Sequence, residues 1–170
     1  MQDTRKMIVG YMRPVDIMCS NILTHSERQA AVKNFVDSVM DEYNKDFIMK
    51  IMKECGGVIS GSVITRELLD EDWKCHDLDI FCYNSNIQPE DIQRIPGCRM
   101  FSLTRKYTND NSITFLWSLK VKYLDRVYNI IMTEEDSIEG ILKNVIENFD
   151  FNFLKNSLYL EEGIWNISIS

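Results

Sequence analysis

The sequence contains few of the residues that interrupt regular structure, with 3 prolines and 7 glycines among 170 residues. Flexible linkers and low-complexity segments are rich in these residues, so we expect neither in this chain. A disordered chain is also excluded, because 45% of the residues are hydrophobic and 11% are aromatic. A chain of this length and composition is expected to form a single domain over residues 1–170.

Long apolar segments are also absent. The early apolar run at residues 7–10 is short, and Arg13, Pro14 and Asp16 lie soon after it and prevent its extension. A membrane-spanning helix needs about 20 mostly apolar residues, and an export signal needs an apolar run of about 7–15 residues. We therefore expect no membrane span, no export signal and no membrane partner.

Positive charge is in deficit, with 19 Lys and Arg residues against 26 Asp and Glu residues and a net charge of -7. Broad, non-specific DNA binding depends on cations that neutralise phosphates, so this class of function is excluded, although a local basic patch is not. The 5 cysteines have no regular spacing, and Cys75, His76, Cys82 and Cys98 do not follow a compact zinc-ligand pattern. Reduced thiols in a cytoplasmic protein are the simpler interpretation.

The N-terminal part, residues 1–57, is expected to be helical after an irregular arm at residues 1–23. Thr24 and Glu27 have the spacing of a capping box, which satisfies the free N–H groups of a first helical turn. Apolar residues then recur at helical spacing up to Tyr43, and residues 44–46 predict a break before a second helical stretch at residues 47–53. The glycine pair at residues 56–57 predicts the end of that helix.

Residues 58 onward predict short strands and helices without regular β–α alternation. Apolar patterning predicts helices at residues 62–69, after Pro89, and at residues 138–146, where Asp136 or Ser137 is the expected cap. A turn is predicted at residues 109–111 and a tail hairpin about residues 161–163. The expected fold is α+β, with a mixed sheet on which the N-terminal helices pack. The remaining predicted strands are residues 58–59, 77–83, 99–103, 113–124, 127–132 and 149–153.

Two segments carry residue types that bind charged ligands. Gly61 and Ser62 lie between a predicted strand and a predicted helix, where glycine permits close backbone approach and the helix start supplies N–H groups for a phosphate. Asp77 and Asp79 are two residues apart on a predicted strand, so both carboxylates face one side and could bind one hard cation. Each feature also has a simpler explanation, namely an exposed acidic edge strand and a common turn sequence.

This combination of a Gly61–Ser62 turn, a short helix and an Asp77-x-Asp79 strand resembles the nucleotidyltransferase superfamily typified by DNA polymerase beta. Weaker similarity at residues 111–115, at residues 149–151 and in the hairpin between them resembles the small stand-alone members of phages and large viruses. The resemblance covers residues 58–159 and implies a nucleotidyltransferase-like core.

The resemblance also implies an activity and a set of site residues. Members of the superfamily use magnesium to transfer a nucleoside monophosphate from a triphosphate to a hydroxyl. By this resemblance, Asp77 and Asp79 are expected to bind Mg²⁺ or Mn²⁺ and to be catalytic. Gly61 and Ser62 are expected to hold the nucleoside triphosphate. Arg66, near the start of the helix, could stabilise charge on the phosphates.

Two departures from the family pattern leave a second interpretation open. The third family carboxylate often lies on the second arm of a hairpin, where this chain has Asn129. Asp150, on the polar face of the next predicted strand, is the candidate to replace it as a catalytic residue. The residues after Asp150 are also too few for the helical domain that comes after the core in many members. The alternative is a catalytically inactive member that acts as a nucleotide-binding or protein-interaction module, such as a viral regulatory protein.

Several Lys and Arg side chains could bind a triphosphate or a nucleic acid, or could simply be solvated on an outer face of the molecule. The acceptor in this interpretation is a protein or an RNA, and the sequence specifies neither the acceptor nor the base. The cations are Arg66, Arg105, Lys106, Lys120, Lys122 and Arg126.

Overall fold

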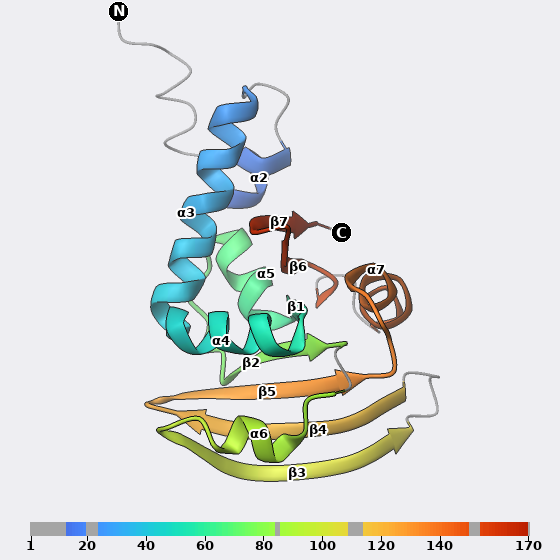
Figure 1. Cartoon of the computed structure of the whole chain (residues 1–170). Coiled ribbons are helices and arrows are strands. Elements are labelled where there is room, and N and C mark those ends of the chain that lie inside the picture. The colour runs from blue at the N-terminus through green and yellow to red at the C-terminus, as the bar shows by residue number, and fades with distance from the viewer. Residues whose placement is uncertain (1–12, 20–23, 84–85, 109–113, 150–153, 170) are drawn as a thin grey trace, which may run out of the picture.

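The computed structural model describes residues 13–19, 24–83, 86–108, 114–149 and 154–169. Its centre is a mixed sheet of seven strands in the order β3-β4-β5-β2-β1-β6-β7, with helices packed against it (Figure 1). The expected α+β class is therefore confirmed. The strands are β1 (Gly57–Ser60), β2 (Asp77–Cys82), β3 (Cys98–Thr108), β4 (Thr114–Tyr123), β5 (Arg126–Thr133), β6 (Ser157–Glu161) and β7 (Ile164–Ser168).

The strand order joins segments that are distant in sequence. Among the described strands, β2 and β5 pair in parallel, whereas the other neighbours pair antiparallel. The β4–β5 hairpin thereby places β5 beside β2, and the β6–β7 hairpin returns to pair with β1. Strands β1 and β2 consequently lie in the interior of the sheet, with a neighbour on each side.

One face of the sheet packs against four helices. Fully buried residues of the central strands, such as Leu78, Ile80 and Ile130, belong to the same apolar cluster as residues of the helices. Figure 1 shows α4 crossing above the sheet and α3 rising away from it beyond the β6–β7 hairpin. The helices are α3 (His25–Tyr43), α4 (Lys45–Cys55), α5 (Ser62–Leu69) and α6 (Pro89–Gln93).

The N-terminal helices begin and end where local sequence signals place them. Thr24 accepts a hydrogen bond from the Glu27 N–H and the Glu27 carboxylate accepts one from the Thr24 N–H, which confirms the capping box. Asn44 adopts a positive φ of 61° and its side chain caps α4, so the predicted break is also confirmed. No helix in the described ranges is both long and apolar enough to cross a membrane.

The opposite face is covered in part by an irregular helix at residues 138–148. The sequence predicts one regular amphipathic helix here, but the chain forms a short α-helix, α7 (Ile138–Gly140), then a π-helical turn (Ile141–Val145) and a 3₁₀ turn (Ile146–Asn148). Ser137 caps the helix through a hydrogen bond from the Gly140 N–H. Val145 and Ile146, where the π-helical turn meets the 3₁₀ turn, are both buried against the sheet.

The structure differs from the sequence predictions at two other places. Residues 14–19 form a short helix, α2 (Pro14–Cys19), where an irregular arm is expected. Proline suits a first helical turn, and the Arg13 and Asp16 side chains pair across that turn at 2.9 Å. Strand β3 extends beyond the predicted strand, and its pairing with β4 contains a bulge between Met100 and Ser102. The predicted turn at residues 109–111 and most of the predicted strand at residues 149–153 lie outside the described residues.

Candidate active site

Strand register places the candidate residues on neighbouring strands. Asp79 of β2 is paired with Ser60 of β1 on one side and with Asn129 of β5 on the other. Asn129 is in turn paired with Lys120 of β4. Because side chains alternate along a strand, Asp77 lies on the same face as Asp79, opposite the buried Leu78. The pairing therefore gathers two carboxylates, an amide and an ammonium on one face of the sheet.

This polar group lies where the sheet is not covered by the irregular helix. Phe81, the next residue of β2 on this face, is buried against Ile141 and Val145. Asp77 and Asp79 are only half-buried. On this face of β2, Phe81 is therefore covered by the irregular helix, whereas Asp77 and Asp79 remain partly accessible to solvent.

The turn at Gly61 lies directly against Asp79. Gly61 has φ 99° and ψ -157°, a conformation that is essentially restricted to glycine, and it precedes the first residue of α5. A Cβ atom at this position would lie 2.9 Å from Asp79 Oδ2. Ser62, half-buried, begins α5. The structure therefore brings together the turn and the carboxylate that the sequence singles out separately.

Substitution of Gly61 by alanine is expected to destabilise the fold by about 2–4 kcal/mol, because the backbone strain adds to a close contact with the Asp79 carboxylate. Urea unfolding measures the effect. The matched control is Gly163→Ala, since Gly163 also has a positive φ of 79° but nothing lies within 4 Å of an added Cβ. The Gly163→Ala substitution is expected to lower the free energy of unfolding by only about 1–2 kcal/mol, from backbone strain alone. Equal effects at the two positions would contradict the close contact at Asp79.

Ser60 has a structural role at the end of β1. Its hydroxyl is fully buried and donates to the backbone carbonyl of Asn156 at 2.8 Å, with the Leu154 carbonyl at 3.0 Å. The Asn156 amide donates to the Thr65 hydroxyl of α5 at 3.3 Å. The segment that leads into β6 is therefore fixed against the Gly61 turn, which no short-range signal in the sequence indicates.

Asp79 is held in a chain of polar contacts. The Asn129 amide donates to Asp79 Oδ1 at 3.1 Å, and the Ser118 hydroxyl donates to Asn129 Oδ1 at 3.0 Å. The pKa of Asp79 is raised to about 6, chiefly by burial and also by the neighbouring charge of Asp77, although the Asn129 hydrogen bond and Lys120 act in the opposite direction. At neutral pH the Asp79 carboxylate is therefore ionised, and its negative charge is only partly compensated by its neighbours.

Asp77 forms an ion pair that sequence reasoning missed. Lys120 Nζ lies 2.7 Å from Asp77 Oδ2, and the Asp77 side chain is 29% exposed. The sequence marks Lys120 only as one of several cations. Its placement depends on the register of β4 against β5, which sets Lys120 beside Asn129 and therefore near β2. The hairpin turn at residues 124–125 is the signal that could have given this register.

Arg66 lies at the contact between α5 and α3. Its guanidinium donates to both carboxylate oxygens of Glu42 and pairs with Glu67 at 2.6 Å. Glu42 is also 3.3 Å from Arg126. These partners identify a structural role in joining the two helices, whereas the expected role of Arg66 in triphosphate binding stays a prediction.

Removing this guanidinium is expected to destabilise the fold. The side chains of Arg66, Glu42 and Glu67 are 10%, 23% and 20% exposed, so Arg66→Met would leave two largely buried carboxylates with less compensation. We expect a loss of about 2–4 kcal/mol in the free energy of unfolding, measured by chemical denaturation. The matched control is Arg94→Met, whose side chain is 78% exposed, and which should change stability by no more than about 0.5 kcal/mol. Similar losses in both variants would argue against the structural role.

The predicted third carboxylate, Asp150, lies outside the described residues. Within the described part of the chain, no group of three or more His, Cys, Asp or Glu side chains is arranged to hold a metal ion. Asp77 and Asp79 are consequently the two described carboxylates on which a cation site would depend. The cysteines of the described segments are free thiols.

Comparison with known proteins adds no family assignment, because no family model and no curated protein matches the chain.

Proposed function

We propose that this chain binds a nucleoside triphosphate with Mg²⁺ or Mn²⁺ and transfers the nucleoside monophosphate to an acceptor hydroxyl. The observation that carries the proposal is the contact between the Gly61 turn and Asp79, where an added Cβ would come within 2.9 Å of the carboxylate. A bend that excludes a side chain, next to two carboxylates on one face, suits a phosphate bound beside a divalent cation.

The residues present fit such a cation. Asp77 and Asp79 would hold it, and the raised pKa of Asp79 is consistent with a carboxylate that a cation would compensate. When bound, the ion would supply positive charge next to the phosphates and the leaving pyrophosphate. Lys120 would then no longer pair with Asp77 and could contact a phosphate oxygen instead. The N–H groups at the start of α5 and the Ser62 hydroxyl would hold the triphosphate.

In the proposed reaction, the acceptor oxygen bonds to the α-phosphorus, and the bond from that phosphorus to the bridging oxygen breaks, releasing pyrophosphate. The acceptor hydroxyl gives up its proton, for which Asp150 remains the predicted base. We expect the acceptor to be a protein or an RNA. We also propose a cytoplasmic location, which the free thiols of the described cysteines support.

A second candidate function is nucleotide binding without transfer. The position of Asn129 supports it, because this amide, rather than a carboxylate, lies beside Asp79 on the neighbouring strand. An amide cannot accept the proton of an acceptor and is a weaker ligand for a hard cation.

One pair of measurements separates the candidates. The chain is incubated with each of the common ribonucleoside triphosphates, labelled at the α-phosphate, with Mg²⁺ or Mn²⁺ and with total RNA or total protein as acceptor. Transfer predicts label on the acceptor and an equal amount of pyrophosphate. Binding without transfer predicts a rise in melting temperature, equivalent to about 2.7 kcal/mol at a hundredfold excess over Kd, with no pyrophosphate. If neither response is observed, both candidate functions are rejected.

A further inference from the structure

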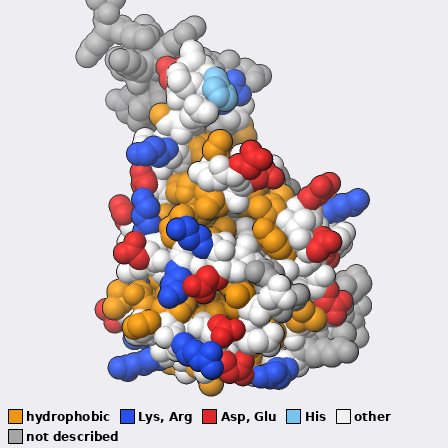
Figure 2. Space-filling model, in the orientation of Figure 1, with side chains coloured by type: hydrophobic (Ala, Val, Ile, Leu, Met, Phe, Trp, Pro, Cys, Tyr) orange, Lys and Arg blue, Asp and Glu red, His pale blue; other side chains and the backbone are white. Residues whose placement is uncertain are grey.

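A groove runs between α3 and the edge strand β7, away from the candidate active site. It has a volume of about 570 Å³, and its apolar lining includes Val32 and Val36 of α3 and Trp165 and Ile167 of β7. Figure 2 shows hydrophobic side chains at the surface between α3 and the β6–β7 hairpin, with Lys and Arg side chains on the α3 side. The groove therefore combines an apolar floor with a charged margin.

One face of α3 forms the first wall. The lining residues of this helix extend from His25 through Arg28 and Val32 to Asp37, at the spacing of a single helical face. These residues rise about 1.5 Å each along the axis, so the wall is roughly 18 Å long. An extended peptide rises about 3.3 Å per residue, so five or six residues would match this length.

The free edge of β7 forms the second wall. β7 is the last strand in the described sheet order, and it comes after a two-residue turn in which Glu162 and Gly163 both have positive φ. The residues that flank such a turn form a hydrogen-bonded pair, and hydrogen-bonded pairs then alternate along the hairpin. The backbone N–H and C=O groups of Ile164 therefore point toward β6. Those of Trp165 and Ile167 point away from β6, toward the open edge.

The charge of the groove is opposite to that of the whole chain. Its lining contains Arg28, Lys33 and Lys45 but a single carboxylate, Asp37, although the chain as a whole has a net charge of -7. Asp37 is already paired with Lys33 at 3.3 Å. The groove consequently favours an acidic partner.

We propose that this groove binds a short acidic segment of another protein, which adds to β7 as an extra strand. The backbone of the segment pairs with the outward groups of Trp165 and Ile167, and its apolar side chains pack on the half-buried Val32 and Trp165. Its carboxylates lie near Arg28, Lys33 and Lys45. An apolar floor beside a strand edge favours a peptide over a nucleic acid. The proposal does not depend on nucleotide binding.

The test uses a synthetic peptide of alternating Glu and Val, about seven residues long, with a fluorescent label. Fluorescence anisotropy should show saturable binding to the full chain below about 1 mM, and the corresponding Lys–Val peptide should bind at least about tenfold more weakly. Amide hydrogen exchange should slow at Trp165 and Ile167 when the Glu–Val peptide is added. A peptide N-methylated at every residue, so that it cannot donate a backbone hydrogen bond along either edge, should lose most of this binding.

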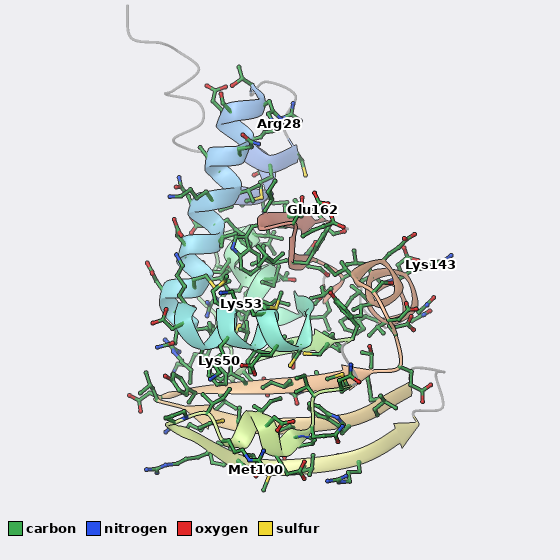
Figure 3. The ribbon with its side chains drawn as sticks, viewed as in Figure 1. Arg28, Lys50, Lys53, Met100, Lys143 and Glu162 are labelled. Atoms are coloured by element: carbon green, nitrogen blue, oxygen red, sulfur yellow. The ribbon has the colours of Figure 1, made fainter. Side chains whose placement is uncertain are left out.

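Charge reversal in the groove provides the matched comparison. The double substitution Arg28→Glu with Lys33→Glu should weaken binding by about tenfold or more, whereas Lys50→Glu with Lys53→Glu should change it less than about twofold. Figure 3 shows Arg28 on the part of α3 that rises away from the sheet, and Lys50 and Lys53 on α4. The control pair is exposed and lies outside the groove lining. Circular dichroism and the melting temperature verify that each variant is folded.

Any one of several outcomes would overturn the proposal. They are no binding of the acidic peptide by the folded wild-type chain, equal binding by the two double variants, no effect of N-methylation, and displacement of the peptide by a single-stranded oligonucleotide. Self-association that disappears in the Arg28→Glu, Lys33→Glu variant would assign the groove to a second copy of this chain instead, and sedimentation velocity detects it.

Discussion

Replacing Asp79 with asparagine is expected to stabilise the folded chain at neutral pH and to remove the proposed response to magnesium and nucleotide. The pKa of Asp79 is raised from 3.8 to about 6, chiefly by burial. Below about pH 4 the carboxyl is protonated in both the folded and unfolded states, and above about pH 6 the folded state holds an unfavourable charge. The stability contributed by this group is therefore lost as the pH rises between these values.

The size of the effect can be calculated from the pKa difference. A shift of about two units corresponds to about 3 kcal/mol, so Asp79→Asn should raise the free energy of unfolding by about 2–3 kcal/mol at pH 7.5 and by almost nothing near pH 4. The asparagine can still accept the hydrogen bond that Asn129 donates to Asp79 Oδ1 at 3.1 Å. Urea unfolding at the two pH values measures the difference.

The same variant tests the proposed activity. If Asp79 holds the cation, Asp79→Asn should lower nucleotidyl transfer by at least about a hundredfold and abolish the rise in melting temperature with Mg²⁺ and nucleotide. The matched control is Asp125→Asn, because the Asp125 side chain is fully exposed at the β4–β5 turn. It should leave both stability and activity unchanged. If the Asp79→Asn variant is stabilised yet fully active, the Asp79 carboxylate does not take part in the chemistry and its proposed role is rejected.

Substitution of Asn129 by aspartate is expected to have the opposite effect on stability and to strengthen metal binding. A carboxylate at this position would face Asp79 in place of the amide that now donates at 3.1 Å. Without a divalent cation, the like charges should destabilise the fold by about 2–4 kcal/mol at neutral pH. With a third carboxylate in the site, affinity for Mg²⁺ or Mn²⁺ should rise by about tenfold or more.

Melting temperature with and without Mn²⁺ measures both effects in the Asn129→Asp variant. Asn166→Asp, on the edge strand β7, is a matched substitution far along the sheet from β5 and should gain no metal response. If Asn129→Asp is neither destabilised nor responsive to Mn²⁺, position 129 does not belong to a cation site, which would argue against the proposed cation site at Asp77 and Asp79.

The predictable parts of the fold are those set by nearby residues. The Thr24–Glu27 capping box and the break at Asn44 each depend on contacts within one helical turn, and both are present. The position of Asp77 and Asp79 on one face depends only on the two-residue period of a strand. Such features result from covalent geometry and local hydrogen bonding.

The remaining parts depend on register and packing between distant segments. The Lys120–Asp77 ion pair exists because β4 pairs with β5 in a particular register, which includes a bulge between Phe115 and Trp117. The contacts that bind Arg66 to Glu42 depend on how α3 packs on α5. The change from α-helix to a π-helical turn after α7 is likewise not indicated by the regular apolar spacing of residues 138–146. None of these conditions is encoded within one window of the sequence.

The hydrogen bonds of Ser60 have a consequence for biosynthesis. Its partner hydroxyl, Ser157, is 97 residues further along the chain, and the carbonyls of Leu154 and Asn156 lie nearly as far. While the polypeptide is still emerging from the ribosome, β1 has no neighbour on its β6 side, and the glycine bend beside it lacks these anchors. At about 5–20 residues per second, this interval lasts roughly 5–20 s. The proposed catalytic site is therefore completed only after residues 154–157 have been synthesised, when the N-terminal helices have had time to form.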